Sequence, residues 1–450
     1  MTMIGLPQSG WIDTMEELES WTVGGDIYNR ANLLPLQPRP AANTGPQLFI
    51  FHDMYGGYIP DGDLYPQGTP NPNYYAFNFW QYVDIFSYFT HHWVAVPPPS
   101  WINAGHRNGV PILGNLTPPY GDNGSFVQPM LDATDLYVEQ LVAIAQYYGF
   151  DGWAFNFETN LLHGNKSARQ LVTFLSRLTS RLHSALAGSK VVWYDSVDMQ
   201  GIISYQNELN ANNGPYFEAC DGIFLNYNWS TAGLNSSATY AGDRARDVFA
   251  GIQPFIKQFD TYQSLQQADQ AGVSGGLFAQ SWTYQKQTDS DPFEKREQRF
   301  WIGHPPQYPK PQNCVASVIS ERPLPATYPL VTNFNVGRGR MFFVDGSQVS
   351  AVGTEPAEVH WGNLSAQDIL PTYRYWTSAG SPRLFEPRIC HDAAFDGGGS
   401  LLIAAARSRK GDSIKLTLFN VALTIPADCT FSLTFMPFNE ASLPELAVIL

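Results

Sequence analysis

Eight short apolar segments recur between residue 46 and residue 282, with turns or helical patterns between them. The segments occupy residues 47–53, 83–89, 110–116, 152–158, 191–196, 222–228, 248–254 and 275–282. A strand followed by a helix, repeated to a count of eight, is the pattern of a (β/α)8 barrel, whose usual length is about 250 residues. The sequence therefore predicts an α/β fold with a (β/α)8 TIM barrel, which we place at residues 46–305.

Two of the intervening stretches have the spacing of amphipathic helices. Residues 132–149 place one apolar set on a single face, after an Asp or Thr cap and before Gly149: Leu136, Leu141, Ile144, Ala145 and Tyr148. Residues 167–186 do the same with Leu171, Phe174, Leu175, Leu178 and Leu182. The early units are less regular, and the Pro-, Gly- and Tyr-rich connection at residues 59–75 is predicted to be an active-site loop.

The character of the sequence changes after Trp301. A Pro-rich stretch at residues 304–312 is followed by strand-like runs with Gly-rich and basic turns between them. The runs are residues 331–336, 340–346, 400–408, 412–423 and 430–438. They predict an antiparallel β-sandwich domain at residues 306–450, and residues 1–45 are expected to form an N-terminal extension that packs on the barrel.

The overall charge and the cysteine pattern exclude several classes of protein. A net charge of −14 argues against a nucleic-acid partner, which calls for a basic stripe, and against an anionic membrane surface. The sequence has no apolar run long enough for a membrane span, and its N-terminus lacks the basic and apolar regions of a secretory signal. The four cysteines are scattered without CxxC spacing. We therefore expect a cytoplasmic protein without a metal or cofactor.

The segment GFDGWAFNFET at residues 149–159 carries the candidate chemistry. Side chains alternate along a strand, so one face holds Gly152, Ala154, Asn156 and Glu158, and the other holds Asp151, Trp153, Phe155 and Phe157. The bulky apolar face belongs against the helices, which directs Asn156 and Glu158 inward at the carboxyl end of the strand, where barrel active sites are built. The alternative is a buried polar pair with a structural role, and Asp151 is expected to be structural.

A carboxylate with an amide two residues before it restricts the reaction. Glu158 can protonate a leaving glycosidic oxygen and later deprotonate water. Asn156 can be neither nucleophile nor general base, but its amide can hold a substrate group in a fixed orientation. If the sugar carries a 2-acetamido group, the acetamido oxygen can attack C1 and form an oxazoline, which removes the need for a second carboxylate. The pair therefore predicts substrate-assisted cleavage of an N-acetylhexosaminide.

Several motifs, taken in their order along the chain, resemble the endo-β-N-acetylglucosaminidases of glycoside hydrolase family 85. They are FHDMYGGY, GFDGWAFNFET, VVWYDSV, ISYQNELN, DGIFLNYNW, GGLFAQSWTYQ and TNFNVGRGRMFFVDG. The resemblance covers residues 46–405 and implies a retaining enzyme that cuts between the two core GlcNAc residues of an N-linked oligosaccharide or glycoprotein. A retaining intermediate also allows transfer of the glycan to a GlcNAc acceptor in place of water, which is transglycosylation, and the sequence does not give the balance between the two reactions.

The resemblance implies roles for single residues as well. Glu158 would be the general acid/base, Asn156 would orient the acetamido group, and Tyr194 would contact that group or the intermediate. The substrate-binding positions on the barrel rim would be Tyr205, Trp229, Trp282 and Tyr284. Tyr205 stands where a Trp is expected in many relatives, and residues 117–125 depart from the acidic and aromatic stretch expected there. These two departures leave the preferred glycan class open.

Two other functions remain open at this point. A family 18 chitinase-like hydrolase also has Asp and Glu at the spacing of Asp151 and Glu158, but the two middle acidic residues of that motif are Ala154 and Asn156 here. A glycan-binding protein without catalysis is the alternative from another class. The combination of Asn156, Glu158 and Tyr194 argues against it.

Overall fold

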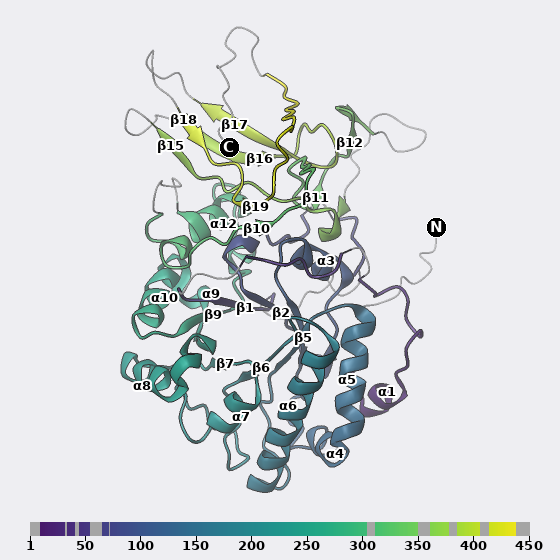
Figure 1. Ribbon diagram of the computed structural model, residues 1–450, viewed down its shortest axis with the longest axis vertical. Coiled ribbons are helices and arrows are strands. Elements are labelled where there is room, and N and C mark those ends of the chain that lie inside the picture. The colour runs from purple at the N-terminus through teal and green to yellow at the C-terminus, as the bar shows by residue number, and fades with distance from the viewer. Residues whose placement is uncertain are drawn as a thin grey trace.

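The eight predicted segments form the parallel strands of a closed barrel in the computed structural model of the chain (Figure 1). The structure describes residues 10–31, 34–40, 45–54, 65–71, 73–303, 311–349, 361–377, 385–405 and 414–437. Strand pairing runs around the ring in the order β1, β2, β4, β5, β6, β7, β8 and β9, and β9 pairs with β1. The barrel prediction is confirmed. Residues 59–64 and 72 of the predicted active-site loop lie outside the described residues.

Each predicted segment overlaps one strand of the ring, although β6 and β9 each begin one residue before the predicted segment. The barrel strands are β1 (Leu48–His52), β2 (Ile85–Tyr88), β4 (Ile112–Leu116), β5 (Gly152–Phe155), β6 (Lys190–Tyr194), β7 (Gly222–Leu225), β8 (Val248–Ile252) and β9 (Ser274–Phe278). A short extra strand, β3 (Val94–Ala95), pairs antiparallel with the second half of β4. The strands are shorter than the predicted segments, so the polar residues at the ends of those segments lie on the barrel rim.

The strand side chains separate into an inner and an outer core. The inner core consists of Phe49, Phe51, Ile85, Phe89, Leu113, Ala154, Val192, Tyr194, Phe224 and Phe249. On the outer side, Trp153 Nε1 donates to the carbonyl of Leu141, and the ring of Phe155 lies 6.3 Å from that of Phe174. The alternation predicted for β5 is therefore confirmed. Gly152 is required in this strand because a Cβ there would lie 2.0 Å from the carbonyl oxygen of Lys190.

Helices cover the outside of the barrel. They are α1 (Met15–Ser20), α3 (Pro99–Arg107), α4 (Val127–Asp132), α5 (Thr134–Tyr148), α6 (Asn165–Ala185), α7 (Gly214–Ala219), α8 (Thr231–Ala241), α9 (Pro254–Lys257), α10 (Thr261–Gln270), α11 (Trp282–Gln285) and α12 (Phe293–Ile302). Short 3₁₀ helices span Trp80–Tyr82, Gly242–Asp247, Gln258–Asp260, Val315–Ser317 and Leu364–Ala366. In the described part of the chain, no helix has both the length and the apolar character that a membrane span needs.

The two predicted helices are α5 and α6. Gly149 ends α5 in a left-handed conformation, with φ of 85°, as expected. Two details of the prediction are wrong. Leu136 is 58% exposed instead of lying on the core face, and Ala133 precedes the helix without a side-chain cap. The reason is that α4 ends at Asp132, so the predicted Asp cap already belongs to a helix and the first turn of α5 reaches into solvent.

The described part of the N-terminal extension contacts α5. The side-chain amide of Gln140 donates to the carbonyls of Leu18 at 2.9 Å and Trp21 at 2.7 Å. The guanidinium of Arg30 donates to the carbonyl of Tyr147 at 3.1 Å. These bonds hold residues 15–31 against the outer helix layer.

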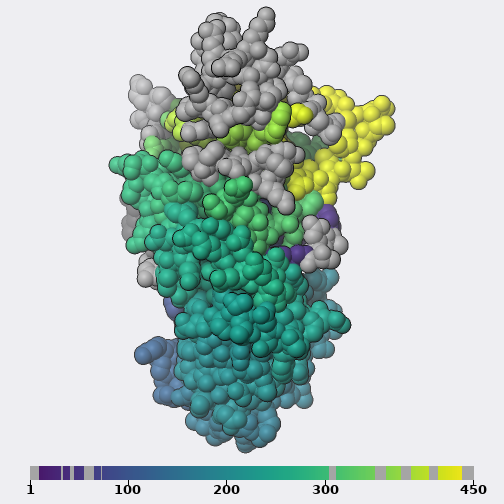
Figure 2. Space-filling model, turned by 90° about the vertical axis from the view of Figure 1, so that its left-hand side faces the viewer, coloured from purple at the N-terminus to yellow at the C-terminus, as the bar shows by residue number. Residues whose placement is uncertain are grey.

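The described part of the chain after residue 311 forms short strand pairs. This region lies above the barrel in the views of Figures 1 and 2. The strands are β10 (Leu324–Pro325), β11 (Arg338–Gly339), β12 (Phe343–Val344), β13 (Ser347–Gln348), β14 (Trp361–Gly362), β15 (Tyr375–Thr377), β16 (Phe385–Cys390), β17 (Ser400–Ala405), β18 (Ile414–Leu416) and β19 (Val421–Ala422). The pairs β11–β14, β12–β13, β15–β18 and β16–β17 are antiparallel, whereas β10 and β19 pair in parallel. The expected change from a barrel to an antiparallel β region is confirmed.

Two of the predicted C-terminal strands are wrong. Residues 331–336 are irregular because the carboxylate of Asp368 accepts the backbone N–H groups of Asn333 and Asn335, which a neighbouring strand would otherwise use. Residues 430–437 are exposed along their whole length and pair with no described strand. Strand-like composition is therefore not sufficient where side-chain carboxylates or solvent take the place of a partner strand.

Candidate active site

Asn156 and Glu158 lie just beyond the end of β5, on the carboxyl-terminal rim of the barrel. The backbone N–H of Asn156 donates to the carbonyl of Leu116 at 2.9 Å, which extends the pairing of β5 with β4. Phe157 points to the outer side, where its ring lies 5.9 Å from that of Trp93. The alternation of the strand thus continues past its end, and it directs Asn156 and Glu158 to the inner side of the rim.

The carboxylate of Glu158 is exposed and is held by a phenol. The hydroxyl of Tyr205, in the loop after β6, donates to Oε2 of Glu158. Burial, followed by the hydrogen bond and charge of Glu158, raises the pKa of Tyr205, so this phenol keeps its proton. Tyr205 is itself 38% exposed. A ligand on the rim can therefore reach both the carboxylate and the ring.

The amide of Asn156 differs from its neighbours in having no protein partner. The residue is 5% exposed, and no side chain or backbone group in the described ranges hydrogen-bonds its amide. Its amide atoms are not among the fully buried polar atoms that lack a partner, so the small exposed part of the residue leaves the amide accessible from the rim. The free amide is therefore suited to hold a polar group of a ligand.

Tyr194 stands at the end of β6, and its ring is part of the inner core. Its hydroxyl donates to Oδ1 of Asn226 at 2.8 Å, and its ring lies 6.2 Å from that of Tyr205. Burial, and then the neighbouring phenols and the charge of Glu158, raise the pKa of Tyr194 far above its usual value. Tyr194 is thus a neutral phenol beside the candidate acid/base.

Asp195 directly follows β6, but its carboxylate is already hydrogen-bonded to other groups of the protein. It accepts the backbone N–H groups of Gln206 at 3.2 Å and Asn207 at 2.7 Å. It also accepts the side-chain amide of Asn213 at 2.9 Å and the backbone N–H of Asn226 at 3.4 Å. These bonds hold the loop that carries Tyr205 and leave Asp195 no role as a second catalytic carboxylate.

Sequence reasoning missed Tyr227 and Asn226, which follow β7. The ring of Tyr227 lies 6.3 Å from that of Tyr194 and 6.0 Å from that of Phe278. Burial, followed by the charge of Glu158, raises the pKa of Tyr227. The available signal was their place at the end of the apolar segment 222–228, because polar residues that follow barrel strands collect on one rim.

Two of the remaining predicted substrate contacts, Trp229 and Tyr284, lie apart from Glu158 in the structure. Trp229 is half-buried on the outer side, and its indole N–H donates to the carbonyl of Gly251 at 2.7 Å. Tyr284 packs against the rings of Tyr75 at 5.5 Å and Phe293 at 5.3 Å, and its hydroxyl donates to a backbone carbonyl. Neither of them contacts Glu158.

The structure does not bring Trp282 to the rim. It is 2% exposed, its ring packs against Phe259 at 5.1 Å and Phe300 at 6.0 Å, and the guanidinium of Arg296 lies 4.8 Å from its centre. Because α11 begins at Trp282 and lies against α12, the indole is buried in the helix layer with no face free for a sugar. We therefore leave Trp282 out of the site.

Asp151 has the structural role that its position predicts. Its carboxylate accepts the backbone N–H of Ile112 at 2.8 Å and bonds Nε2 of His106 at 2.8 Å. No three His, Cys, Asp or Glu side chains are grouped as metal ligands within the described ranges.

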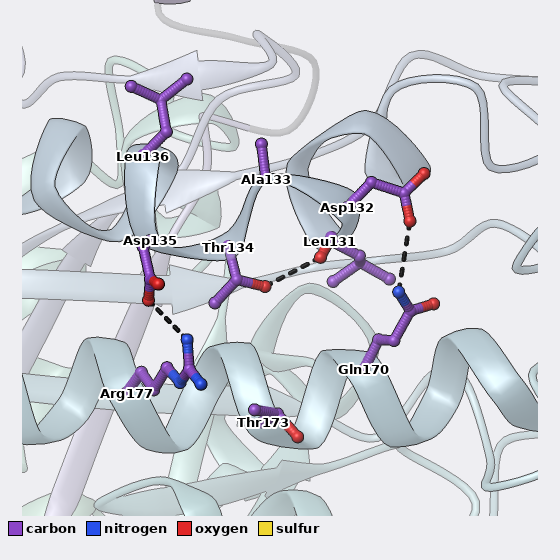
Figure 3. Close-up of a pocket in the computed structure, with 9 residues that line it drawn as sticks. All are labelled: Leu131, Asp132, Ala133, Thr134, Asp135, Leu136, Gln170, Thr173 and Arg177. Carbon is purple, nitrogen blue, oxygen red and sulfur yellow. Dashed lines mark hydrogen bonds and ion pairs between the residues drawn. The ribbon is translucent and has the colours of Figure 1, made fainter.

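A separate hollow lies between α4, α5 and α6 (Figure 3). Its volume is about 350 Å³, and Leu136 is one of the side chains that line it. Its charged groups have protein partners, because Arg177 pairs with Asp135 at 2.5 Å and Gln170 donates to Asp132 at 3.2 Å. None of the predicted site residues lines this hollow, so the rim around Glu158 remains the candidate active site.

Known proteins are similar to this chain in sequence and in fold. The chain is 36% identical over 412 residues to a cytosolic endo-beta-N-acetylglucosaminidase of Gallus gallus, with 88% of this chain and 52% of that protein covered. It is 34% identical over 447 residues to the Mus musculus protein of the same name, with 95% and 57% covered. The chain thus spans about half the length of the curated relatives it matches.

A solved structure supports the architecture. The glycoside hydrolase domain of Endo-D from Streptococcus pneumoniae R6 superimposes with a TM-score of 0.77 at 23% identity, covering 93% of this chain and 70% of that one. At this identity the similarity concerns the fold. The family model described as glycosyl hydrolase family 85 matches residues 60–342, which is more than half of the chain. The chain belongs to glycosyl hydrolase family 85.

Proposed function

We propose that the chain is an endo-β-N-acetylglucosaminidase that cuts the GlcNAc-β1,4-GlcNAc core of N-glycans and leaves one GlcNAc on the peptide. The observation that carries the proposal is the pair on the rim, the exposed carboxylate of Glu158 and the amide of Asn156 without a protein partner in the described ranges. The names of the chicken and mouse relatives support this activity and a cytosolic location.

The first step uses the substrate as its own nucleophile. Glu158 in its acid form gives a proton to the glycosidic oxygen while the C1–O bond breaks. The oxygen of the 2-acetamido group attacks C1 from the opposite face and closes an oxazolinium ring, which keeps its N–H proton and lies beside the newly formed carboxylate of Glu158. Asn156 orients the acetamido group for this attack, and Tyr194 lines the same space.

The second step returns the proton. The carboxylate of Glu158 takes a proton from water as the water oxygen bonds to C1, and the C1–O bond of the oxazolinium ring breaks to restore the acetamido group with its N–H. Two inversions at C1 give overall retention. A GlcNAc hydroxyl in place of water completes transglycosylation by the same proton transfer.

The residues around this pair supply binding and not chemistry. Tyr205 holds Glu158 and presents an exposed ring, so we propose that it contacts the sugar on the leaving-group side. Trp229 and Tyr284 are half-buried, and we keep them as outer contacts of a long glycan.

A digest of defined glycopeptides tests the proposal. The protein is incubated with one peptide that carries high-mannose, hybrid or complex N-glycans, and mass spectrometry follows the products. The expected product is peptide with a single GlcNAc, and NMR of the released glycan should show the β anomer first. Glu158→Gln is the control for a contaminating activity. If no glycan class gives this product, the protein is a glycan-binding protein without catalysis.

A further inference from the structure

Two backbone groups fix the orientation of the Asn207 side chain, in the loop after β6. Its Nδ2 donates to the carbonyl of Tyr205 at 2.9 Å, and its Oδ1 accepts the backbone N–H of Asn228 at 3.0 Å. A carbonyl can only accept a hydrogen bond and an N–H can only donate one. The nitrogen and the oxygen of the Asn207 amide therefore cannot exchange places without losing both bonds.

The orientation of Asn207 in turn fixes that of Asn226. The Oδ1 atom of Asn207 also accepts Nδ2 of Asn226 at 2.9 Å, so Oδ1 of Asn226 faces the hydroxyl of Tyr194 at 2.8 Å. An amide oxygen carries no hydrogen, so Tyr194 is the donor in this bond. Asn226 and Tyr194 are both buried, so water does not compete freely for the contact.

This bond determines what Tyr194 can offer to a ligand. A neutral phenol has one hydrogen, and Tyr194 donates it to Asn226. The ring of Tyr227 lies 6.3 Å from that of Tyr194 on the same side of the rim. The Tyr194 oxygen keeps lone-pair density that can face the site.

We infer that Asn226 is a positioning residue that makes Tyr194 a hydrogen-bond acceptor for the bound sugar. Tyr194 would then receive a hydrogen bond from an N–H or a hydroxyl group of the substrate. The inference rests on the proposed function, because it assigns a role within the same site. Turning the Tyr194 hydroxyl toward the sugar would leave the buried oxygen of Asn226 without a donor, which opposes that rotation.

A double-mutant cycle tests this role. Wild type, Asn226→Leu, Tyr194→Phe and the double variant are assayed for kcat and KM on the glycopeptide. The Leu side chain has the same number and branching of heavy atoms as Asn but forms no hydrogen bond. Asn226→Leu is expected to lower kcat about tenfold with little change in KM, as for the loss of one oriented hydrogen bond. In the Tyr194→Phe background it is expected to have no further effect. Equal losses in both backgrounds would overturn the inference.

A second variant acts on the same chain of contacts from the loop. Asn207 has a φ of 58°, so Asn207→Gly keeps a permitted backbone conformation while it removes the amide that orients Asn226. It should lower kcat severalfold when Tyr194 is present and have no effect on Tyr194→Phe. An equal loss of kcat in the presence and absence of the Tyr194 hydroxyl would show that Asn207 acts through the backbone of its loop and not through that hydroxyl.

Stability measurements separate positioning from folding. Asn108→Leu removes another buried amide, which donates to the carbonyl of Ala104 at 2.8 Å at the end of α3. It should lower Tm but leave kcat unchanged. A wild type that forms no single-GlcNAc peptide would refute the proposed function alone. The Tm losses of Asn226→Leu and Tyr194→Phe must still be less than additive if their bond exists, and strict additivity would refute the inference.

Discussion

Glu158 and Asn156 are two residues apart, yet their surroundings suit them to different tasks. Glu158 is exposed and accepts a hydrogen bond from the Tyr205 hydroxyl on the rim, so its carboxylate is open to substrate and water. Asn156 is buried and has no partner among the described residues, so a ligand group that reaches it meets donors and an acceptor already in place. Pre-oriented groups of this kind act on the transition state because they need not reorganise during the reaction.

Glu158→Gln is expected to lower hydrolysis at least about 100-fold, because the amide can neither donate the acid proton nor accept it from water. The fold should persist, since the side chain is exposed and Gln can still accept the hydroxyl of Tyr205. The rate of single-GlcNAc peptide formation measures the effect. Glu139→Gln, an exposed change on α5, is the matched control and should retain full activity. Near-normal rates in Glu158→Gln would remove this residue from the acid role.

Asn156→Ala is expected to slow cleavage of the glycopeptide about 100-fold, by analogy with the loss of one group that stabilises a transition state. The same variant should still transfer the glycan from a pre-formed oxazoline donor to a GlcNAc acceptor, since that donor has passed the step that Asn156 serves. Parallel assays with the two donors measure the difference. Equal failure with both donors in a folded variant would assign Asn156 another role.

At the scale of elements, the two ends of β5 have different roles. Its rim end carries the site, and its other end is held by Asp151, which bonds α3 through His106. Nδ1 of His106 faces the carbonyl of Leu34 at 2.8 Å, and Nε2 faces the carboxylate of Asp151. Both ring nitrogens therefore face acceptors, and only the imidazolium, with two N–H groups, satisfies both.

This geometry predicts a pH dependence of stability. Burial by itself lowers the pKa of His106, but the hydrogen bond and charge of Asp151 and the carbonyl of Leu34 outweigh it and raise the pKa above its usual value. The stabilising contribution is then fully present below the unfolded pKa of about 6.5 and is lost as the pH rises through the folded pKa. Because the pKa of His106 is raised in the folded protein, the Tm difference between wild type and His106→Gln should shrink from pH 6 to pH 9. A constant difference over this range would contradict the charged pair.

At the scale of the whole molecule, Gln367 is one of several side chains that join the C-terminal region to the barrel, as Arg322 does through Asp84. The amide nitrogen of Gln367 donates to the carbonyls of Phe77 at 2.9 Å and Val336 at 3.1 Å. Its oxygen accepts the indole N–H of Trp80 at 2.8 Å, and Arg107 donates to its backbone carbonyl at 2.6 Å. Trp80 and Arg107 precede strands β2 and β4 in the chain, so Gln367 contacts the barrel at the end opposite to the rim that carries Glu158.

Gln367→Leu is expected to lower the free energy of unfolding by about 2 kcal/mol or more, because it leaves the buried Trp80 N–H and two carbonyls without partners. The activity of the folded fraction should not change. Chemical denaturation and the rate per folded molecule test the two statements. Gln263→Leu, an exposed change on α10, should stay within about 0.5 kcal/mol of wild type. An unchanged stability in Gln367→Leu would show that the contact is not needed to hold the region in place.

Alternation within one strand predicted the direction of Asn156 and Glu158, whereas Tyr194 and Tyr205, from another strand and the loop after it, were expected only through the family resemblance. The alternation through β5 correctly separated Asp151 from Asn156 and Glu158, because side-chain direction along a strand is a local property. Trp282 lies in an equally rim-like segment, but the start of α11 turns its indole into the helix layer. The predicted strand at residues 430–438 failed for a related reason, since a strand needs a partner that its own residues do not provide.

The sequence by itself determined the barrel and the shared direction of Asn156 and Glu158, because both depend on periods of two and of 3.6 residues that can be read along the chain. Only the tertiary structure decided which side chains surround that pair. Tyr205 reaches Glu158 from 47 residues away, and Asn226 reaches Tyr194 from 32 residues away. These contacts exist because a closed parallel barrel gathers the ends of neighbouring strands on one rim, and no local pattern specifies which residue each loop will place there.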